Sequence, residues 1–340
     1  MSDPEQDARR VARLALAGVC AACRVCDGAR CPSGVPGLGG VGTGESFRAN
    51  VQALAQVRLN LRTLHHSSCP NTGLDFLGFP LTLPILAAPM AGAAFNLGGA
   101  VSEEALVAAL LDGAEAVGTL GCTGDGATPE VEEAAWAALA EKPGQVIPFL
   151  KPWADAELLP KLDQAARLGV RVLGLDLEGI GFTALTDMGR PVVSRTGPEL
   201  AALVSAYPFP FILKGIMTPD EARTAVQAGA SAIVVSNHGG RVLDHTPGVA
   251  EVLPAVAQAV AGRIPVLADG GVRSGADVLK LLALGADAVM VGRPLAVAAV
   301  GGGSQAVAAV LARMGAELAQ AMRLTGCADL ASISPAVLRA

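Results

Sequence analysis

From about residue 84 onward, short apolar runs alternate with longer segments in which apolar residues recur at helical spacing. Eight such runs occur, at residues 85–88, 116–120, 146–150, 170–176, 211–216, 232–236, 265–268 and 288–291. The stretches between them, such as SEEALVAALLDG and SGADVLKLLALGA, open with Ser or an acid and end near Gly, as helices do. Eight strand–helix alternations with continuously apolar strands predict an α/β fold, the (β/α)8 TIM barrel.

An open doubly wound sheet is the competing architecture. It would place a Gly-rich turn after the first strand, where this chain reads PMAGAA, a poor match. The pattern therefore favours the closed barrel.

The region before the barrel has a different character. Residues 1–18 have helical spacing, with Val11, Leu14 and Leu16 as the apolar set, and residues 20–46 are rich in Cys and Gly. Helical spacing returns over residues 47–64. We therefore divide the chain into an N-terminal helix and Cys/Gly-rich segment, residues 1–46, and a barrel domain, residues 47–340.

Composition narrows the class of partner. The chain has 340 residues and a net charge of −6, and its basic residues form no run, so we expect no nucleic-acid partner. The start, MSDPEQDARR, is acidic, and the apolar stretch from residue 81 to 101 is broken by Pro and Gly. We therefore expect neither a secretory signal nor a membrane partner, and a cytoplasmic location.

Polar residues gather where the predicted strands end. Because the carboxyl ends of barrel strands meet on one rim, these residues should share one site. The late strands end in Asp269-Gly-Gly-Val-Arg273 and Gly292-Arg293. Glycines admit close approach of backbone N–H groups, the helix starting near Ser274 directs its positive end to this rim, and the arginines add charge. These residues predict a phosphate site, and a simple tight turn with surface arginines is the alternative.

Three segments on this rim, SNHGGRVLD, LADGGVRSGADVLK and GADAVMVGRP, resemble the FMN-dependent α-hydroxy acid oxidases and dehydrogenases, the family of glycolate oxidase and lactate oxidase. The resemblance extends over about residues 50–330 and is strongest over residues 211–294. It implies an FMN-containing (β/α)8 barrel and a small anionic substrate. It also implies a homo-oligomer, with a tetramer suspected.

The resemblance assigns catalytic roles to three residues. His238 matches the active-site base, Asp176 the carboxylate that pairs with it, and Lys214 the lysine beside the flavin. The alternatives remain a structural histidine, a helix-capping aspartate and a solvated lysine. Arg241 matches the arginine that binds the substrate carboxylate, for which a two-pronged donor is suited. The implied flavin-binding residues are Pro89, Met90, Ala91, Lys214, Ser236, Asp269, Gly270, Gly271, Val272, Arg273, Gly292 and Arg293.

The substrate side departs from the family pattern. The family's tyrosines are missing, since the only tyrosine, Tyr207, precedes the fifth strand. Lys151 stands near one of the expected tyrosine positions, and LEGIGF after Asp176 lacks the family's second arginine. Lys151 and Arg241 together could bind an anion, so we predict them as substrate-binding residues. The sequence leaves the substrate and the electron acceptor open.

Four cysteines, Cys20, Cys23, Cys26 and Cys31, have the spacing C-x2-C-x2-C-x4-C. Thiolates are soft ligands suited to zinc or to an iron–sulfur cluster, so a metal site is one hypothesis. Reduced or redox-active thiols are the other.

These observations predict an FMN-dependent oxidoreductase that converts a lactate- or glycolate-like α-hydroxy acid to the 2-oxo acid. Two other function classes remain. An FMN-dependent isomerase of the type 2 isopentenyl diphosphate isomerase kind would need reduced flavin and give no net oxidation. A redox-sensing flavin module would depend on its cysteines and not on His238.

Overall fold

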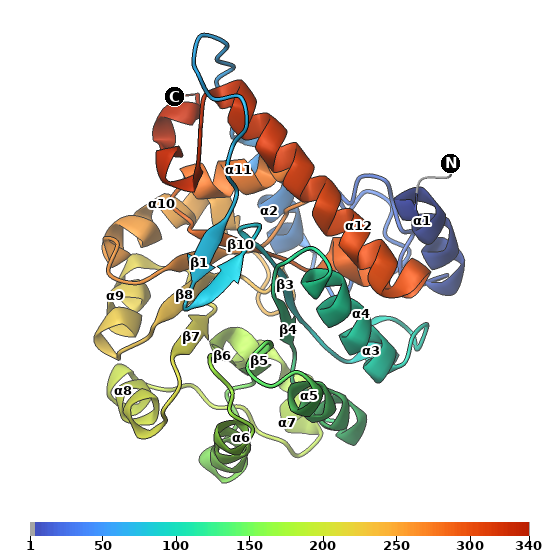
Figure 1. Ribbon diagram of the computed structural model, residues 1–340. Coiled ribbons are helices and arrows are strands. Elements are labelled where there is room, and N and C mark those ends of the chain that lie inside the picture. Colours follow the sequence, from blue (N-terminus) through green and yellow to red (C-terminus); the bar gives the residue numbers. More distant parts are fainter. Residues whose placement is uncertain (1–3, 340) are drawn as a thin grey trace.

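A computed structural model describes residues 4–339, and its centre is a closed barrel of eight parallel strands in the order β10-β3-β4-β5-β6-β7-β8-β9. Figure 1 shows the helices arranged around these strands. The barrel predicted from the sequence is confirmed. The strands are β3 (Ile85–Met90), β4 (Gly121–Thr123), β5 (Ile147–Leu150), β6 (Leu173–Asp176), β7 (Phe211–Lys214), β8 (Ala232–Val235), β9 (Val266–Ala268) and β10 (Ala288–Val291).

The helices follow the strands in the expected alternation. They are α3 (Ala93–Asn96), α4 (Glu103–Glu115), α5 (Pro129–Glu141), α6 (Asp155–Arg167), α7 (Thr183–Asp187), α8 (Gly197–Ala206), α9 (Pro219–Gln227), α10 (Val249–Val260), α11 (Gly275–Ala283) and α12 (Arg293–Thr325), with short 3-10 turns η1 (Leu177–Gly181), η2 (Leu330–Ser332) and η3 (Pro335–Val337). Ser102, Thr196, Thr218 and Ser274 cap four of them, as Ser and Thr prefer to do.

Two apolar clusters explain why the strands are apolar on both faces. One lies between strands and helices, and the other fills the barrel interior with residues such as Leu86, Ile147, Ile212 and Leu267. A hairpin that the sequence analysis missed, β1 (Leu74–Phe76) and β2 (Phe79–Leu81), adds Phe76 and Phe79 to the interior cluster. The hairpin therefore helps to fill the barrel interior with side chains.

The second strand was placed too early in the sequence. Residues 116–118 are not a strand, because they form the turn that ends α4, and the strand itself begins at Gly121. The N–H of Thr119 donates to Ala114 O (3.0 Å), and Gly118 has a φ of 69°, which only glycine adopts easily. The apolar residues at the start of this run therefore belong to the turn that ends α4 and not to a strand.

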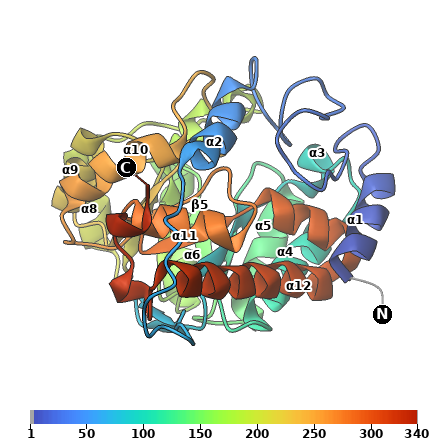
Figure 2. The same ribbon diagram turned by 90° about the horizontal axis from the view of Figure 1, so that it is seen from above.

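The N-terminal region lies against the barrel. Helix α1 (Pro4–Ala15) lies beside α12 in both views (Figures 1 and 2). Its buried face is Ala8 and Ala12, continued by Leu16, whereas Leu14 is 77% exposed and Val11 is also exposed, so the predicted apolar set was wrong for those two. Small alanines allow the close helix packing that a larger leucine would prevent.

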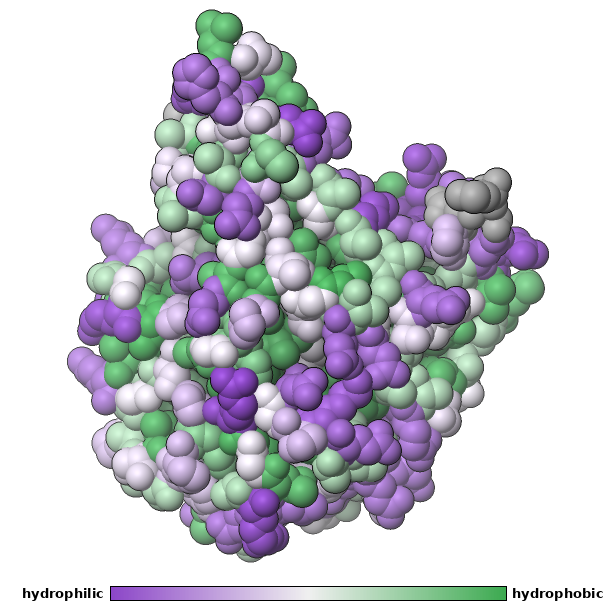
Figure 3. Space-filling view, in the orientation of Figure 1, coloured by the Kyte–Doolittle hydropathy of each residue, from purple (hydrophilic) through white to green (hydrophobic). Residues whose placement is uncertain are grey.

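Helix α2 (Glu45–Gln56) is shorter than the pattern over residues 47–64 indicated. The chain beyond it runs out as the blue projection of Figure 1, where Leu61 is 72% and Leu64 is 99% exposed. The tip of this projection is hydrophobic in Figure 3, while the rest of that face intersperses hydrophilic and apolar residues.

Among the described residues, α12 alone has the length and apolar composition of a membrane span, with a mean hydropathy of 1.8. It bends at Gly302 and Gly303 and packs along α1, α4 and α11. Its apolar side faces other helices, as expected for a core helix.

Candidate active site

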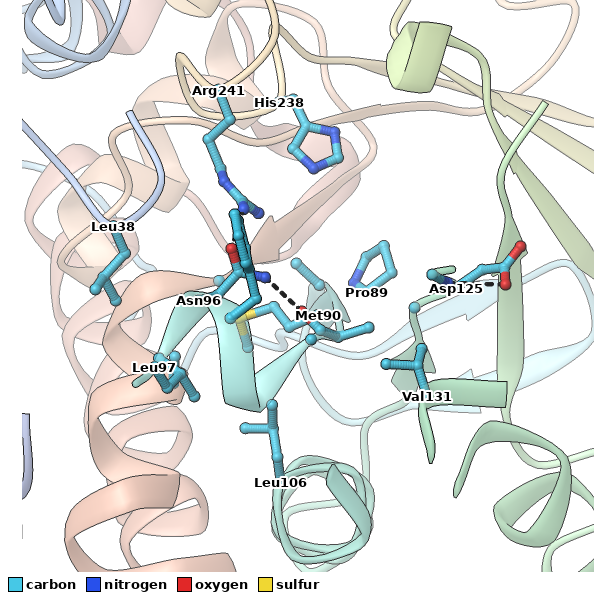
Figure 4. Close-up of a pocket in the computed structure, with 18 of the residues that line it drawn as sticks. Leu38, Pro89, Met90, Asn96, Leu97, Leu106, Asp125, Val131, His238 and Arg241 are labelled. Carbon is cyan, nitrogen blue, oxygen red and sulfur yellow. Dashed lines mark hydrogen bonds between the residues drawn. The ribbon is translucent and has the colours of Figure 1, made fainter. Parts of the chain in front are cut away.

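A cavity of about 700 Å³ opens at the carboxyl ends of the strands. In Figure 4, His238 and Arg241 lie on one side of it, across from Pro89 and Met90. The cavity wall includes every residue predicted from the sequence to act in catalysis or to bind substrate, and every predicted flavin-binding residue except Ser236. Ser236 is fully buried beneath the wall, where its Oγ accepts a hydrogen bond from the His238 N–H (3.0 Å).

An acid–base cluster forms one end of the cavity. Asp176 at the end of β6 and Lys214 at the end of β7 are neighbours in the barrel register, and Lys214 Nζ lies 2.9 Å from Asp176 Oδ1. The Nδ1 atom of His238 lies 3.3 Å from the same oxygen and 3.1 Å from Glu178 Oε1. Glu178 also pairs with Lys214. Each charged side chain therefore has an opposite charge beside it.

Burial and pairing fix the charges of this cluster. Burial alone would raise the pKa of Asp176, but Lys151, Lys214 and His238 hold it well below the usual range. Burial likewise opposes the charge of Lys214, yet Asp176 and Glu178 raise its pKa above the ordinary lysine value. Both groups are charged at neutral pH. The ammonium groups of Lys151 and Lys214 thus compensate the carboxylates, which leaves little reason for a metal ion here although Asp176, Glu178 and His238 lie close together.

The backbone of His238 is held in an unusual conformation. Its φ is 55°, in the left-handed region that non-glycine residues seldom occupy, and Gly239 and Gly240 continue in that region. The ring of Phe182 meets the imidazole edge-on, with centroids 5.0 Å apart. With Nδ1 directed at the carboxylates, Nε2 has no hydrogen-bond partner within residues 4–339 and is available to a bound molecule.

Lys151 reaches the same cluster from β5. Its Nζ pairs with Asp176 Oδ2 and lies 4.6 Å from the centroid of Phe182. A second buried carboxylate, Asp125, fixes the backbone at this point, since its Oδ2 accepts from Lys151 N (2.9 Å) and Trp153 Nε1 (2.6 Å). Asp125 therefore positions Lys151.

Arg241 lies farther along the cavity. Its Nη2 donates to Asn96 Oδ1 (2.5 Å), and its guanidinium lies 5.7 Å from the Phe182 ring. Its Nε is buried and has no hydrogen-bond partner among the described residues. The side chain is therefore held in place with donor capacity left over.

Three partly buried arginines, Arg241, Arg273 and Arg293, lie toward the other end of the cavity. Arg293 donates to Gly239 O and Leu38 O (both 2.9 Å), and Arg273 donates to Cys26 O (3.2 Å). Burial, together with the charges of Arg241 and Arg273, lowers the pKa of Arg293 to about 9. Among the described residues, these three guanidinium groups donate to backbone or amide oxygens and form no salt bridge to a carboxylate. Partly buried cations without a carboxylate partner indicate an anion site.

The glycine-rich backbone at this end of the cavity allows a ligand to approach the main chain closely. Gly270 and Gly271 have φ values of 81° and 82° and pack against Asn50, where a Cβ would come within 2.9 and 2.6 Å. The helix end differs from the sequence prediction. The first N–H groups around α11 are occupied, because Asp277 accepts from Arg273 N and Ser274 N, and Glu317 accepts from Gly275 N. The N-terminus of α12 at Gly292, which has no side-chain cap, also lies on the cavity wall.

Sequence reasoning missed Glu178 and Phe182. The stretch LEGIGF lacks the family's second arginine, and its glutamate, two residues after the end of a strand, was the signal that could have indicated Glu178. Phe182 carried no signal, because only the η1 turn brings its ring between His238, Lys151 and Arg241.

The four cysteines of the N-terminal segment line a second, smaller cavity. It shares Leu38, Arg273 and Arg293 with the first cavity. The metal site at Cys20, Cys23, Cys26 and Cys31 stays a prediction.

Comparison with known proteins gives a consistent result. The family model described as FMN-dependent dehydrogenase matches residues 38–182 and 183–340. Peroxisomal (S)-2-hydroxyacid oxidase of Arabidopsis thaliana is 31% identical over 327 residues, covering 87% of this chain and 88% of that protein. L-lactate oxidase of Roseobacter sp. (strain GAI101) is 47% identical over 150 residues, covering 44% of this chain and only 40% of that protein. A solved structure of mandelate oxidase superimposes with a TM-score of 0.80 at 29% identity, covering 100% of this chain and 98% of that one.

Proposed function

Because the chain belongs to the family of FMN-dependent dehydrogenases, we propose that it oxidises a small α-hydroxy acid to the 2-oxo acid, with His238 as the base. The enzyme is an FMN-dependent oxidoreductase built on a (β/α)8 barrel. The substrate class and the role of each residue are the parts that we infer.

The residues of the cavity fit FMN. Arg273 and Arg293 lack a carboxylate partner, and a ribityl phosphate would supply the compensating anion. Buried Asp269 Oδ1 and Arg293 Nε have no partner among the described residues, as expected where a polar ligand is to bind. Arg273, Arg293 and the backbone of Gly270, Gly271 and Gly292 would hold the phosphate. Pro89, Met90, Ala91 and Lys214 would contact the ring system, and when bound, FMN supplies the hydride acceptor.

The chain's own residues perform the proton chemistry. Nε2 of His238 takes the hydroxyl proton of the substrate, and the carboxylates of Asp176 and Glu178 at Nδ1 stabilise the imidazolium that results. Lys151 and Arg241 lie on the same cavity wall and bind the substrate carboxylate. Two cations would thus provide the charge that the family's arginine pair supplies.

The single observation that carries this proposal is the placement of His238, with Nδ1 on two carboxylates and Nε2 open to the cavity. Anaerobic addition of lactate, glycolate or mandelate to the purified flavoprotein tests it. We expect bleaching of the oxidised flavin band by at least one of these acids and formation of the matching 2-oxo acid. Absence of bleaching with every 2-hydroxy acid would remove the substrate assignment.

The flavin isomerase remains a weaker alternative, since it offers no use for a histidine so arranged. The same measurement separates the two, because an isomerase produces no 2-oxo acid. A redox-sensing module would make no use of the two carboxylates at Nδ1 of His238 or of its open Nε2.

We also propose a homo-oligomer, with a tetramer suspected. Exposed Leu61 and Leu64 on the projection after α2 support it, because exposed apolar tips are commonly covered by a partner. A cytoplasmic location without nucleic-acid or membrane partners remains a proposal drawn from composition.

A further inference from the structure

Four cysteines converge on one small cavity outside the substrate site. Cys20, Cys23, Cys26 and Cys31 all line a space of about 90 Å³, and none of them forms a disulfide. All four are partly buried, and the cavity is closed on its far side by Pro294, Val297 and Ala298 of α12. The sequence spacing therefore brings four thiols to a walled site against the barrel.

No three of the four thiol sulfur atoms all lie within 4.8 Å of one another, a wider arrangement than the thiolates of a tetrahedral zinc site have. At a Zn–S distance of about 2.3 Å, tetrahedral ligands place their sulfur atoms about 3.8 Å apart. Within residues 4–339, the only group of three ligand atoms that all lie within 4.8 Å of one another is that of Asp176, Glu178 and His238. The cysteines thus surround a wider space. An iron–sulfur cluster fits such a space, because its thiolates bind different iron atoms.

The charges around the cavity favour thiolates bound to metal. Arg273 Nη2 lies 3.5 Å from Cys26 Sγ, and Arg293 is also on the wall. These guanidinium groups would compensate the negative charge of a cluster bound by thiolates.

Backbone groups also point at the sulfur atoms. Ala22 N–H donates to Cys20 Sγ (3.4 Å), and Gly37 N–H donates to Cys31 Sγ (3.2 Å). Ala22 has a φ of 41°, an unusual value for alanine. At Gly37, a Cβ would lie 2.6 Å from the Phe47 ring. N–H donors to cysteine sulfur are a means by which proteins tune iron–sulfur clusters.

We propose that Cys20, Cys23, Cys26 and Cys31 ligate a four-iron, four-sulfide cluster next to the arginine end of the flavin cavity. The two cavities share Leu38, Arg273 and Arg293 as a common wall. The cluster is thus placed to exchange electrons with the flavin, a role that rests on the proposed function.

The electron balance of that role is simple. Each α-hydroxy acid converted to a 2-oxo acid releases two electrons and two protons. The cluster changes by one electron at a time, so both electrons leave in two successive single transfers. They pass to two equivalents of a one-electron carrier protein, for which ferricyanide substitutes in vitro. The two protons are released to solvent.

Metal analysis of the full-length protein, purified without oxygen, tests the proposal. We expect about four iron and four acid-labile sulfide per chain, and a paramagnetic signal after reduction with dithionite. One zinc per chain without sulfide, or no bound metal, would overturn the assignment. Both iron and sulfide are measured independently of substrate oxidation.

Matched variants locate the cluster. Cys23→Ser and Cys31→Ser should each lose most of the iron, whereas Cys69→Ser, at an exposed cysteine outside the cavity, should keep it. FMN content and circular dichroism report whether each variant folds. A folded Cys23→Ser or Cys31→Ser protein with full iron content would contradict the ligand set.

Alkylation of the unmodified protein serves if the variants fail to fold. Under anaerobic conditions, iodoacetamide should label Cys69 but spare the four ligands until iron is removed with a chelator. Labelling of all four before iron removal would overturn the proposal. An iron-loaded protein that no 2-hydroxy acid bleaches would instead refute only the substrate assignment.

Discussion

The two ends of the active-site cavity handle charge in opposite ways. At the acid–base end, Asp176 and Glu178 are matched by Lys151, Lys214 and His238, so the chain balances its own charges. At the other end, the partly buried Arg241, Arg273 and Arg293 lie near one another without carboxylate partners in the described chain, and the pKa of Arg293 falls to about 9.

The two ends therefore differ in whether they need a ligand, because only the acid–base end is preorganised by the protein alone. The acid–base end is complete without a ligand, because every charge that it needs is supplied by the protein. At the arginine end, like charges repel one another and a bound anion would compensate them. The stability of this end should therefore depend on the ligand.

The largest effect is expected at His238. His238→Gln removes the base while the arginine end is untouched, so we expect turnover to fall by about 10²- to 10⁴-fold with FMN content unchanged. Steady-state kinetics of the flavin-loaded protein measure the first effect, and the absorbance ratio of flavin to protein measures the second. His245→Gln, at an exposed histidine, should behave like the unmodified protein. Turnover within a factor of two of normal would exclude His238 as the base.

An intermediate effect is expected at Arg293. Arg293→Met removes a buried guanidinium, so FMN should bind about 10- to 100-fold more weakly, as expected for a lost charge-assisted hydrogen bond. Without FMN, the same variant should melt at an equal or higher temperature than the unmodified protein, because an uncompensated buried charge has gone.

Calorimetric titration with FMN and thermal melts of the apoprotein check both expectations for Arg293. Arg171→Met, at an exposed arginine that donates to Gly78 O, is the matched control. A variant that binds FMN normally, or an apoprotein that is much less stable, would show that the arginine end is not the anion site.

The smallest expected effect is the pH dependence of the stability that Asp176 contributes at the acid–base end. The pKa of Asp176 in the folded protein lies below the unfolded value of about 3.9. Its contribution to stability is therefore complete above that unfolded value and is lost as the pH falls through the folded one. Asp176→Asn should lower the melting temperature at pH 7 by several degrees. The difference from the unmodified protein should shrink below about pH 4, and a difference independent of pH would contradict the pairing.

The sequence by itself determined the barrel and the identity of its rim. Apolar runs alternating with helical spacing specify parallel strands buried on both faces, and the ends of such strands must share one rim. For that reason the sequence predicts one site for His238, Asp176, Lys214 and the glycines around residue 270, and all of them line one cavity.

Only the tertiary structure decided how the side chains pair on that rim. Glu178 joins the acid–base cluster through a 3-10 turn, and Lys151 turns to Asp176 because Asp125 holds its backbone. Loop directions depend on long-range packing, which no local periodicity encodes. The cysteine segment shows the same division. The spacing of the cysteines suggested a metal site, but the width of the cavity that they line and the wall that it shares with Arg293 depend on how residues 20–38 pack against the barrel.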